Sequence, residues 1–419
     1  MEIDLARQQK AREYARTRRR LSYVSMGVGA LCVLIVLGTG LDRWFRDFIQ
    51  HTTSHSAWLT WQPQPAWYPW QILLYFLLIF ILYEIVTLPL AYYSGYVLPH
   101  RYGISVMSIR AWLRDLGMGF VLTLLLEAIF ISLIYTLLAL QPQLWWLWTA
   151  LIILFFSVIM ANLAPVLLFP LFYKFTPLED GELKQRLLAL VERAHTHVRG
   201  VFLMKMSNRT TSTNAALMGL GNTRRIVVGD TMTDRYTDDE IEVVLAHELG
   251  HHVHHDIWKL ITTQSLLTLI GLFLGSLVLH WVVDQQHIYR ALTDSAMIPF
   301  LLLLVGLYSL IIMPLSNGYT RHVEYQADEY ALQATNKIEP FKSAMRRLAN
   351  QNLAEVEPAP LVEFLFYSHP SIKKRLAHAD EYAGRDKHEH ASHGTTHDPQ
   401  PNVEPATGVS DNAAFNAES

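Results

Sequence analysis

Two histidines and a glutamate lie close together in the stretch TDDEIEVVLAHELGHHVHHDIW, which runs from Thr237 to Trp258. His247, Glu248 and His251 have the spacing HExxH. A helix places residues four apart on the same face, so both imidazoles can bind one metal ion with the glutamate beside it. A Zn²⁺ ion with three protein ligands activates a water molecule, and a neighbouring carboxylate can take the proton. The stretch therefore predicts a zinc site that hydrolyses peptide bonds, with Glu248 as the base.

The residues around this pattern predict the helix that it needs. Thr237 and Glu240 have the spacing of a capping box, and Ile241, Val244 and Leu245 recur at helical spacing. A histidine-rich amphipathic helix without a metal would carry the same pattern, so a third ligand is needed to decide between the two interpretations.

The third ligand has to come from another part of the chain. A metzincin would continue with glycine and histidine, but this chain has His254 and Ile257 at those positions. Glu324 lies in the stretch RHVEYQADEYA, and Asp328 follows it by one helical turn. We predict that Glu324 is the third ligand and that Asp328 accepts a hydrogen bond from a ligating imidazole.

Five stretches of the chain resemble the type I CAAX prenyl endopeptidases, a family of integral-membrane zinc metalloproteases of the gluzincin type. They occur in the family's order and span most of the chain. The stretches are APVLLFPLFYKFTPL (164–178), TNAALMGLGNTRRIVVGDT (213–231), HELGHH (247–252), RHVEYQAD (321–328) and YSHPSIKKRL (367–376).

The resemblance implies roles for three further residues. Asn214 matches a residue of the substrate cleft, although Thr213 and Ala216 stand where the family usually has serine and tyrosine. Arg321 matches the basic residue just before the ligand glutamate and is assigned, with Asn214, to substrate binding. His369 matches a cleft histidine that donates a hydrogen bond to the developing oxyanion; the alternative is an ordinary residue at a helix entry.

The composition is that of a membrane protein. Of the 419 residues, 51% are hydrophobic and only 17% are charged, against a usual charged share of about a quarter. The net charge of −3 and the absence of a basic stripe interleaved with aromatics argue against a nucleic-acid partner. Cys32 is the only cysteine, which excludes an intramolecular disulfide and a thiolate zinc cluster.

Six apolar stretches have the length needed to span a bilayer. They lie at about 21–41, 70–93, 116–140, 144–173, 260–283 and 297–315, and a seventh span arises if 144–173 splits near its prolines. The tryptophan-containing segment 42–69 is expected to be a loop along the outer headgroups, and basic residues at 7–20 and 100–114 place the amino terminus and the active site on the cytoplasmic side.

The predicted fold class is mainly α: a multi-span membrane helical barrel, as the resemblance implies, with an α+β gluzincin-type metalloprotease domain. A helix at 182–198 and strands at 201–206 and 224–229 form the α+β part. The expected organisation is a basic cytoplasmic arm (1–20), a four-span membrane region (21–173), a metalloprotease domain with the HExxH helix (174–258), a transmembrane hairpin (259–316), a second metalloprotease part with the third zinc ligand (317–383) and a disordered histidine-rich tail (384–419).

These observations predict a membrane-integral zinc metalloendopeptidase with one zinc ion per chain. The resemblance implies peptide or protein substrates that are prenylated or associated with the membrane. One alternative is an HtpX-like protease for quality control of membrane proteins. A non-catalytic transporter or scaffold with a vestigial metal site is the alternative from another class, and the intact His247, Glu248, His251 and Glu324 argue against it.

Overall fold

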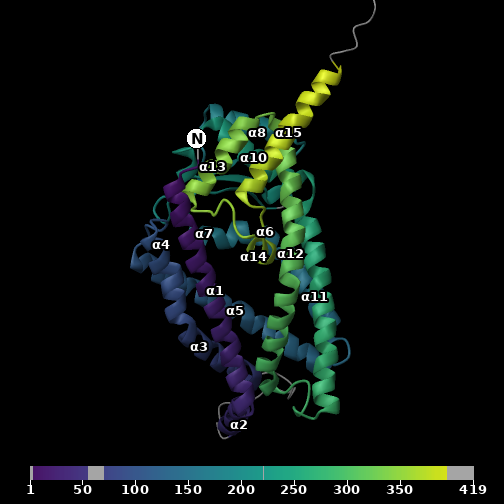
Figure 1. Ribbon diagram of the computed structural model, residues 1–419. Helices are drawn as coiled ribbons and strands as arrows, with labels where there is room; N and C mark the ends of the chain where they lie inside the picture. Colours follow the sequence, from purple (N-terminus) through teal and green to yellow (C-terminus); the bar gives the residue numbers. More distant parts are fainter. Residues whose placement is uncertain (1–2, 55–69, 220, 394–419) are drawn as a thin grey trace, which may run out of the picture.

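The computed structural model describes residues 3–54, 70–219 and 221–393. Long helices run along most of the molecule, and shorter helices with a small sheet gather at the end where the amino terminus lies (Figure 1). Within the described residues, six helical segments are long and apolar enough to cross a membrane. They are Leu5–Thr39, Trp70–Arg101, Ile109–Leu140, Trp145–Phe172, Asp256–Gln285 and Ser295–Thr335.

The first four of these segments come from the amino-terminal part of the chain. Two of them, the second and the fourth, contain a π-helical turn followed by a short α-helix. The elements are α1 (Leu5–Thr39), α2 (Leu41–Ser54), α3 (Trp70–Tyr92), η1 (Tyr93–Val97), α4 (Leu98–Arg101), α5 (Ile109–Leu140), α6 (Trp145–Leu163), η2 (Ala164–Leu168) and α7 (Phe169–Phe172).

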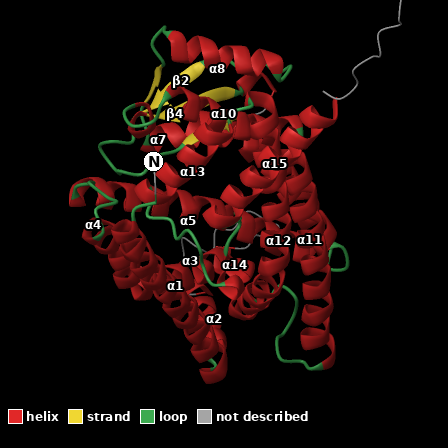
Figure 2. Cartoon of the chain, turned by 45° about the horizontal axis from the view of Figure 1, so that its top comes forward, coloured by secondary structure: helices red, strands yellow, loops and turns green. Residues whose placement is uncertain are grey.

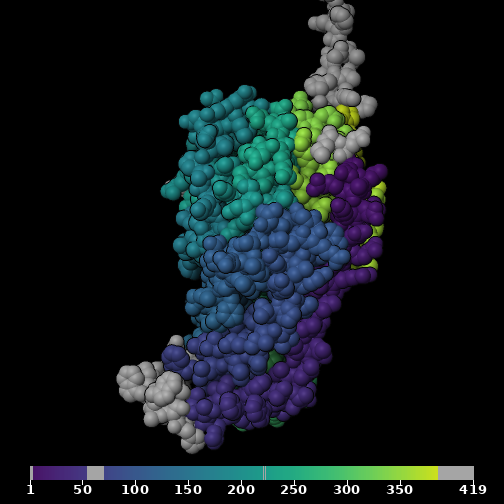
Figure 3. Space-filling view, turned by 90° about the vertical axis from the view of Figure 1, so that its left-hand side faces the viewer, coloured from purple at the N-terminus to yellow at the C-terminus, as the bar shows by residue number. Residues whose placement is uncertain are grey.

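Helix α1 joins the basic arm to the first apolar stretch without a break at the predicted boundary of residue 20. Its first turn is capped by Asp4, whose carboxylate accepts hydrogen bonds from two backbone N–H groups. The arm then reaches the carboxy-terminal part of the chain, because Arg19 forms a salt bridge with Glu355 at 2.8 Å. Figure 3 shows this purple helix running along the molecule to the green region at its upper end.

The expected loop at 42–69 is wrong for its first part, because α2 is helical through Ser54. The helix is amphipathic: Asp42 and Arg46 are buried, whereas Trp44 and Phe48 are exposed and stack on each other. Residues four apart lie on the same face, so one face of the helix is buried and the other is exposed. The tryptophans of the segment favoured an interfacial loop over this helical period. Residues 55–69, which include the other predicted interfacial tryptophans, lie outside the described residues.

The fourth span bends where the sequence has Pro165, as predicted. Pro165 cannot donate a backbone hydrogen bond, and the chain forms the π-helical turn η2 there before α7. The guanidinium of Arg225 donates a hydrogen bond to the Pro165 carbonyl and lies over the Phe175 ring. The bend is thereby attached to the sheet of the metalloprotease domain.

That sheet has four strands in the order β1-β2-β4-β3. Strands β2 and β4 are parallel, and the other two pairs are antiparallel. Strands β2 and β4 match the predicted ones, whereas β1 and β3 lie where the sequence predicted no strand. The elements are β1 (Phe175–Pro177), α8 (Glu182–Arg193), β2 (Val201–Met204), β3 (Ala215–Met218), η3 (Gly221–Thr223), β4 (Arg225–Gly229), α9 (Asp230–Thr233) and α10 (Asp238–Val253).

The core of this domain lies between the sheet and the helices that pack on it. Figure 2 shows β2 and β4 next to α8 and α10, at the end of the molecule away from α2. Leu187, Ile226, Leu245 and Phe341 are almost completely buried there and belong to one hydrophobic cluster. Since α10 carries the HExxH residues, this core fixes their position.

A helical hairpin links the two parts of the metalloprotease domain. It consists of α11 (Asp256–His280), η4 (Trp281–Gln285), η5 (Ser295–Met297) and α12 (Ile298–Thr335). Helices α11 and α12 lie side by side in both ribbon views (Figures 1 and 2). Helix α12 continues from the apolar stretch through Glu324, so the predicted boundary at residues 316 and 317 falls inside one helix.

The remaining helices are α13 (Ile338–Gln351), α14 (Pro360–Phe366) and α15 (Ile372–His393). The tail predicted to be disordered from residue 384 is instead helical as far as His393. A salt bridge of 3.0 Å between Arg385 and Glu329 supports this extension of α15 against α12. Residues 394–419 lie outside the described residues.

Candidate active site

Helix α10 presents the HExxH residues to α12. It begins with the predicted capping box: the Thr237 hydroxyl accepts a hydrogen bond from the Glu240 N–H, and the Glu240 carboxylate accepts one from the Thr237 N–H. Gly250 allows α10 to approach α12 closely, because a Cβ atom there would lie only 3.0 Å from the Ala327 Cα. This close approach brings the two histidines of α10 to the glutamate of α12.

His247, His251 and Glu324 form the cluster that could hold a metal ion. One ligand atom from each residue lies within 4.8 Å of the others. The Nε2 atom of His247 is 3.4 Å from Oε2 of Glu324, and the Nε2 atom of His251 is 3.6 Å from Oε1 of the same carboxylate. The two imidazoles and the carboxylate therefore converge on one point.

The other nitrogen of each histidine faces a carboxylate. His247 Nδ1 is 2.9 Å from Asp328 Oδ1, and His251 Nδ1 is 3.0 Å from Asp256 Oδ2. A carboxylate accepts the Nδ1 hydrogen, which leaves the Nε2 lone pair free for a metal. Asp328 and Asp256 are both almost completely buried, so they hold the rings in this orientation.

The donor set fits a zinc ion. Bonds of about 2.0–2.1 Å place two ligands of a tetrahedral zinc about 3.3–3.5 Å apart, which agrees with the two histidine–glutamate distances. Glu324 is buried, and its Oε2 atom has no hydrogen-bond partner in the described part of the chain. A buried carboxylate oxygen without a donor is costly unless a cation satisfies it.

Arg375 supports the cluster through Asp328. Its Nε and Nη2 atoms donate hydrogen bonds of 2.8 and 2.5 Å to the two Asp328 oxygens, and the guanidinium is buried. Such a bidentate pair fixes the plane of the carboxylate. Asp328 is thus held rigidly where it accepts the His247 hydrogen.

The charges around His247 couple metal binding to protonation. Burial by itself would lower the pKa of His247, but the carboxylates of Asp328 and Glu324 beside its two nitrogens outweigh burial and raise the pKa to about 9. A metal ion at Nε2 therefore has to displace a proton that the two carboxylates stabilise.

His369 belongs to the same cluster although it is distant in sequence. Its Nε2 atom lies 3.3 Å from Glu324 Oε1, and its Nδ1 atom lies 2.9 Å from the Ser368 hydroxyl oxygen. Desolvation lowers the pKa of His369; Glu324 opposes this and Arg375 adds to it. A neutral ring that accepts from Ser368 carries its hydrogen on Nε2, which faces the metal ligands.

The other predicted site residues are Glu248, Asn214 and Arg321. Glu248 follows His247 in α10 and is half-buried. Asn214 is exposed just before β3, and its carbonyl oxygen accepts a hydrogen bond of 2.9 Å from the Gly229 N–H. Arg321 donates hydrogen bonds of 3.0 and 2.6 Å to the Glu363 and Tyr367 carbonyls, so it holds the end of α14, and its role in substrate binding stays a prediction.

Asp256 and Arg375 are the residues of the cluster that sequence patterns missed. Asp256 stands between a histidine-rich turn and an apolar span, and such an isolated carboxylate is a signal that could have identified it. Arg375 was hidden in the run KKR, which is typical of a solvated surface. Only the fold separates it from Lys373 and Lys374, whose side chains are about 60% exposed, whereas that of Arg375 is 9% exposed.

Six membrane-length helices and an HExxH helix whose two histidines converge on a distant glutamate are the defining features of membrane-embedded metalloproteases. Comparison with known families agrees. Residues 177–383 match the family described as Peptidase family M48, and residues 1–174 match the one described as CAAX prenyl protease N-terminal, five membrane helices.

Individual relatives lead to the same family. The chain is 31% identical to the CAAX prenyl protease 1 homolog of Arabidopsis thaliana over 73% of this chain and 71% of the relative. It is 28% identical to the uncharacterized metalloprotease YhfN of Bacillus subtilis over 91% of this chain and 87% of the relative. The crystal structure of S. mikatae Ste24p superposes with a TM-score of 0.72 and 26% identity, covering 90% of this chain and 89% of that one.

The chain therefore belongs to the M48 peptidases of the CAAX prenyl protease type. It is an integral membrane metalloprotease, and the predicted family, the predicted fold class and the predicted peptidase function are confirmed.

Proposed function

We propose that this membrane protease hydrolyses peptide bonds at one zinc ion held by His247, His251 and Glu324. The observation that carries the proposal is the convergence of the two Nε2 atoms on a buried carboxylate whose Oε2 atom has no other partner among the described residues. A zinc ion bound there would activate water at neutral pH and polarise the carbonyl of the scissile bond.

Each surrounding residue has a distinct task. Glu248 takes the proton from the attacking water and later delivers it to the leaving amine. The Nε2 hydrogen of His369 is donated to the oxygen on which negative charge develops. Asp328 and Asp256 hold the ligating rings, and Asn214 binds the substrate backbone beside the edge strand β3.

The substrate is a protein or peptide at the membrane. CAAX prenyl protease 1 homologs in plants and yeast are similar to this chain over about 70% of its length, which supports prenylated substrates. The Bacillus subtilis relative, similar over 91% of the chain, is named only as a metalloprotease, which supports membrane-associated substrates without a prenyl group as a second candidate.

The active site opens toward the cytoplasm in this proposal, because basic residues flank the amino-terminal span and the loop before α5. Cysteines introduced at Gln286 and Glu179, with Cys32 replaced by serine, test the orientation. Both positions are exposed. In intact cells a membrane-impermeant maleimide should label Gln286→Cys and not Glu179→Cys, and the reverse pattern would invert the orientation.

Peptide identification tests the activity and the substrate together. Purified wild-type protein and the Glu248→Gln variant are incubated with a mixture of peptides, half of them carrying a carboxy-terminal prenylated cysteine motif, and products are identified by mass spectrometry. Cleavage by the wild type alone supports the peptidase. Cleavage confined to prenylated peptides favours the first substrate class, and cleavage of both kinds favours the second. Equal products from wild type and variant would overturn the assignment.

A further inference from the structure

The turn that follows α13, residues 352–356, contains a residue with a strained backbone. Leu353 has a left-handed conformation with φ of 46°, at a position of the helix end where glycine is usual. Its side chain is buried, and the next residue, Ala354, donates its N–H to the Ala349 carbonyl at 3.0 Å. Such strain persists only where the surrounding contacts impose it. The contacts of this turn therefore hold a conformation that the backbone alone disfavours.

The first of these contacts is with the segment that leads into β3. The Asn352 side chain accepts a hydrogen bond of 2.9 Å from the Thr213 N–H and donates one of 3.2 Å to the Thr213 carbonyl. The two bonds satisfy both backbone groups of one residue, as a neighbouring strand would do. Thr213 is buried and directly precedes Asn214, which is proposed above to bind the substrate backbone. Asn352 thus fixes the chain just before that residue.

The same turn also contacts the chain on both sides of His369. The Glu355 carboxylate accepts a hydrogen bond of 3.4 Å from the hydroxyl of Tyr367, which lies two residues before His369. The Val356 carbonyl accepts one of 3.1 Å from the N–H of Lys373, in the first turn of α15. The turn therefore joins two segments that are distant in sequence, one before β3 and one around the proposed oxyanion donor.

Helix α1 holds the turn at two points. The Gln8 side chain donates a hydrogen bond of 3.3 Å to the Ala354 carbonyl and accepts one of 3.2 Å from the Val356 N–H. Gln8 is buried although it belongs to the basic arm. Farther along α1, Arg19 forms its salt bridge of 2.8 Å with Glu355. Both ribbon views show the amino-terminal end of α1 next to α13 (Figures 1 and 2).

Strand β3 has few other contacts of the sheet to fix its position. It has only four residues, and it lies at the end of the sheet, where β4 is its one neighbour in the described chain. An extended peptide that pairs with an edge strand needs this strand in a fixed register, because main-chain hydrogen bonds supply the affinity. A side chain that holds the start of β3 therefore affects how well a substrate can bind.

We propose that Asn352 is a positioning residue that holds β3 in register with His369, and that α1 keeps the turn at 352–356 in place for this purpose. The assignment rests on the peptidase function proposed above and adds residues that lie outside the metal cluster. It connects the first membrane-spanning helix with substrate binding through a continuous set of hydrogen bonds.

Kinetics of Asn352→Ala test the effect on substrate binding. The variant loses both hydrogen bonds to Thr213 and keeps the zinc ligands and Glu248. Backbone contacts act equally on the bound substrate and the transition state, so KM for a cleaved peptide should rise about 5- to 30-fold and kcat should change less than about 3-fold. Zinc content should stay at about one ion per chain. A merely structural role would lower the fraction of folded enzyme, and hence kcat, without this rise in KM.

Hydrogen exchange followed by mass spectrometry tests the positioning without a substrate. In Asn352→Ala, amides of residues 213–218 should exchange about 5- to 30-fold faster than in the wild type, because the segment opens more often. Gln8→Ala should increase exchange of the same residues by a smaller factor, since it loosens the turn and leaves Asn352 in place. The double variant should exchange no faster than Asn352→Ala alone, because both changes act through one turn.

The matched control is Lys342→Ala, in the helix that precedes the turn. Lys342 forms hydrogen bonds of 3.1 Å with Glu339 and 2.7 Å with Asp380, and neither partner belongs to β3. This variant also loses two side-chain hydrogen bonds. Its KM and its exchange at residues 213–218 should equal those of the wild type.

Two results with Asn352→Ala would overturn the proposal. Unchanged exchange at residues 213–218 would mean that Asn352 does not hold β3. Faster exchange with an unchanged KM would mean that Asn352 serves the fold and not the substrate. If this variant does not fold, Gln8→Ala decides, and unchanged exchange and KM in that variant would equally overturn the proposal. A wild type that cleaves no peptide contradicts the peptidase function itself, which is a distinct outcome.

Discussion

Each half of α10 lies at a buried carboxylate, Glu242 in the first half and Glu324 of α12 in the second, and the two carboxylates differ in their hydrogen-bond partners. In the first half, both carboxylate oxygens of Glu242 accept hydrogen bonds from cationic side chains, namely Arg186, Arg193 and Lys337. In the second half, the Nε2 atoms of His247 and His251 face the two carboxylate oxygens of Glu324, and Oε2, the oxygen on the His247 side, has no hydrogen-bond partner in the described chain. The carboxylate of the first half is neutralised within the protein, and the second half presents ligand atoms that fit a cation.

This difference separates a structural cluster from a functional one. The Glu242 cluster joins α8, α10 and the start of α13, so its contribution is to stability. The metal cluster is equally buried but keeps its acceptors aimed at one point, because Asp328, Asp256 and Arg375 hold the ligands from behind. Buried polar groups without protein partners are uncommon in folded proteins, and they indicate a ligand-binding site.

The largest expected effect on activity is that of Glu248→Gln. The amide keeps the shape but cannot take a proton, so turnover should fall by about 10²- to 10⁴-fold while zinc remains bound. Glu242→Gln, in the other half of the same helix, is the control and should keep nearly normal activity at pH 7. Appreciable turnover by Glu248→Gln, measured with a cleaved peptide, would mean that another group is the base.

His369→Ala should have the next largest effect. Loss of an oriented donor to the oxyanion lowers kcat by about 10²- to 10³-fold, with zinc content and thermal stability nearly unchanged. Steady-state kinetics and metal analysis on the same preparation separate the two roles. A variant that unfolds or loses zinc would show that His369 is structural, and a normal kcat would exclude it from catalysis.

Replacement of the carboxylates behind the histidines should cost less. Asp256→Asn and Asp328→Asn each leave the metal ligands in place but weaken their orientation, which typically lowers metal affinity or activity about 10- to 100-fold. Competition with a zinc chelator measures the affinity. If Asp256→Asn matches the wild type while Asp328→Asn does not, only the His247 ring depends on such support.

The smallest effect is a change in stability with pH at the satisfied half of α10. Burial alone would raise the pKa of Glu242, but hydrogen bonds from Lys337 and Arg186 outweigh it and lower the pKa. A carboxylate whose pKa is lowered by folding stabilises the fold at pH values above its pKa in the unfolded state, which is about 4.3. This stabilisation is lost as the pH falls through the pKa of the folded state.

Thermal unfolding followed by tryptophan fluorescence tests this expectation. Glu242→Gln should lower Tm by a few degrees at pH 7. The difference from wild type should shrink below about pH 4, where the carboxylate becomes protonated. A difference that stays constant down to pH 3 would show that Glu242 contributes through packing and not through its charge.

The sequence predicted those parts of the molecule that follow a short period or a known spacing. The six spans, the capped HExxH helix and the strands β2 and β4 are examples. The spacing of Glu324 and Asp328 within one helix likewise predicted that both reach the same place. These features depend on local geometry, which a single chain reveals.

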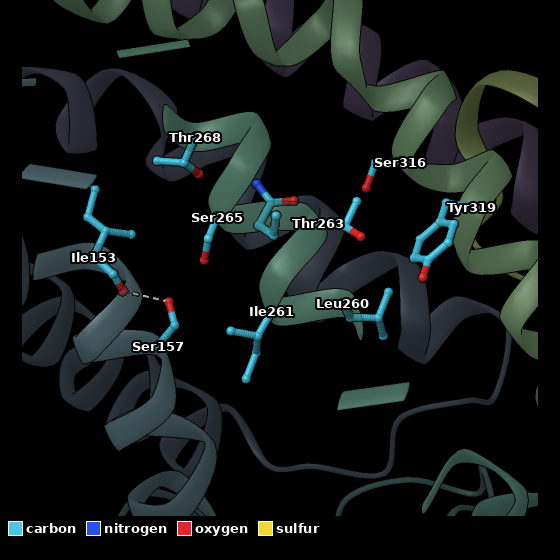
Figure 4. Close-up of a pocket in the computed structure, with 10 residues that line it drawn as sticks. Ile153, Ser157, Leu260, Ile261, Thr263, Ser265, Thr268, Ser316 and Tyr319 are labelled. Carbon is cyan, nitrogen blue, oxygen red and sulfur yellow. Dashed lines mark hydrogen bonds between the residues drawn. The ribbon is translucent and has the colours of Figure 1, made fainter. Parts of the chain in front are cut away.

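The features that were missed depend on contacts between distant segments. Asp256 meets His251 only because the chain turns sharply at His255, which has a left-handed conformation with φ of 60°. Arg375 meets Asp328 only because α15 packs against α12. A cavity lined by α6, α11 and α12 (Figure 4) likewise exists only where three helices meet, and no spacing in the sequence predicts it.

Zinc content measured after gel filtration tests the central claim most directly. Elemental analysis of the wild type and of three variants compares the predicted zinc site with the Glu242 cluster. The variants are Glu324→Gln, Glu248→Gln and Glu242→Gln. The wild type, Glu248→Gln and Glu242→Gln should each hold about one zinc ion per chain. Glu324→Gln should lose most of its zinc, because the ligand charge is gone. Equal zinc in the wild type and Glu324→Gln would contradict the account.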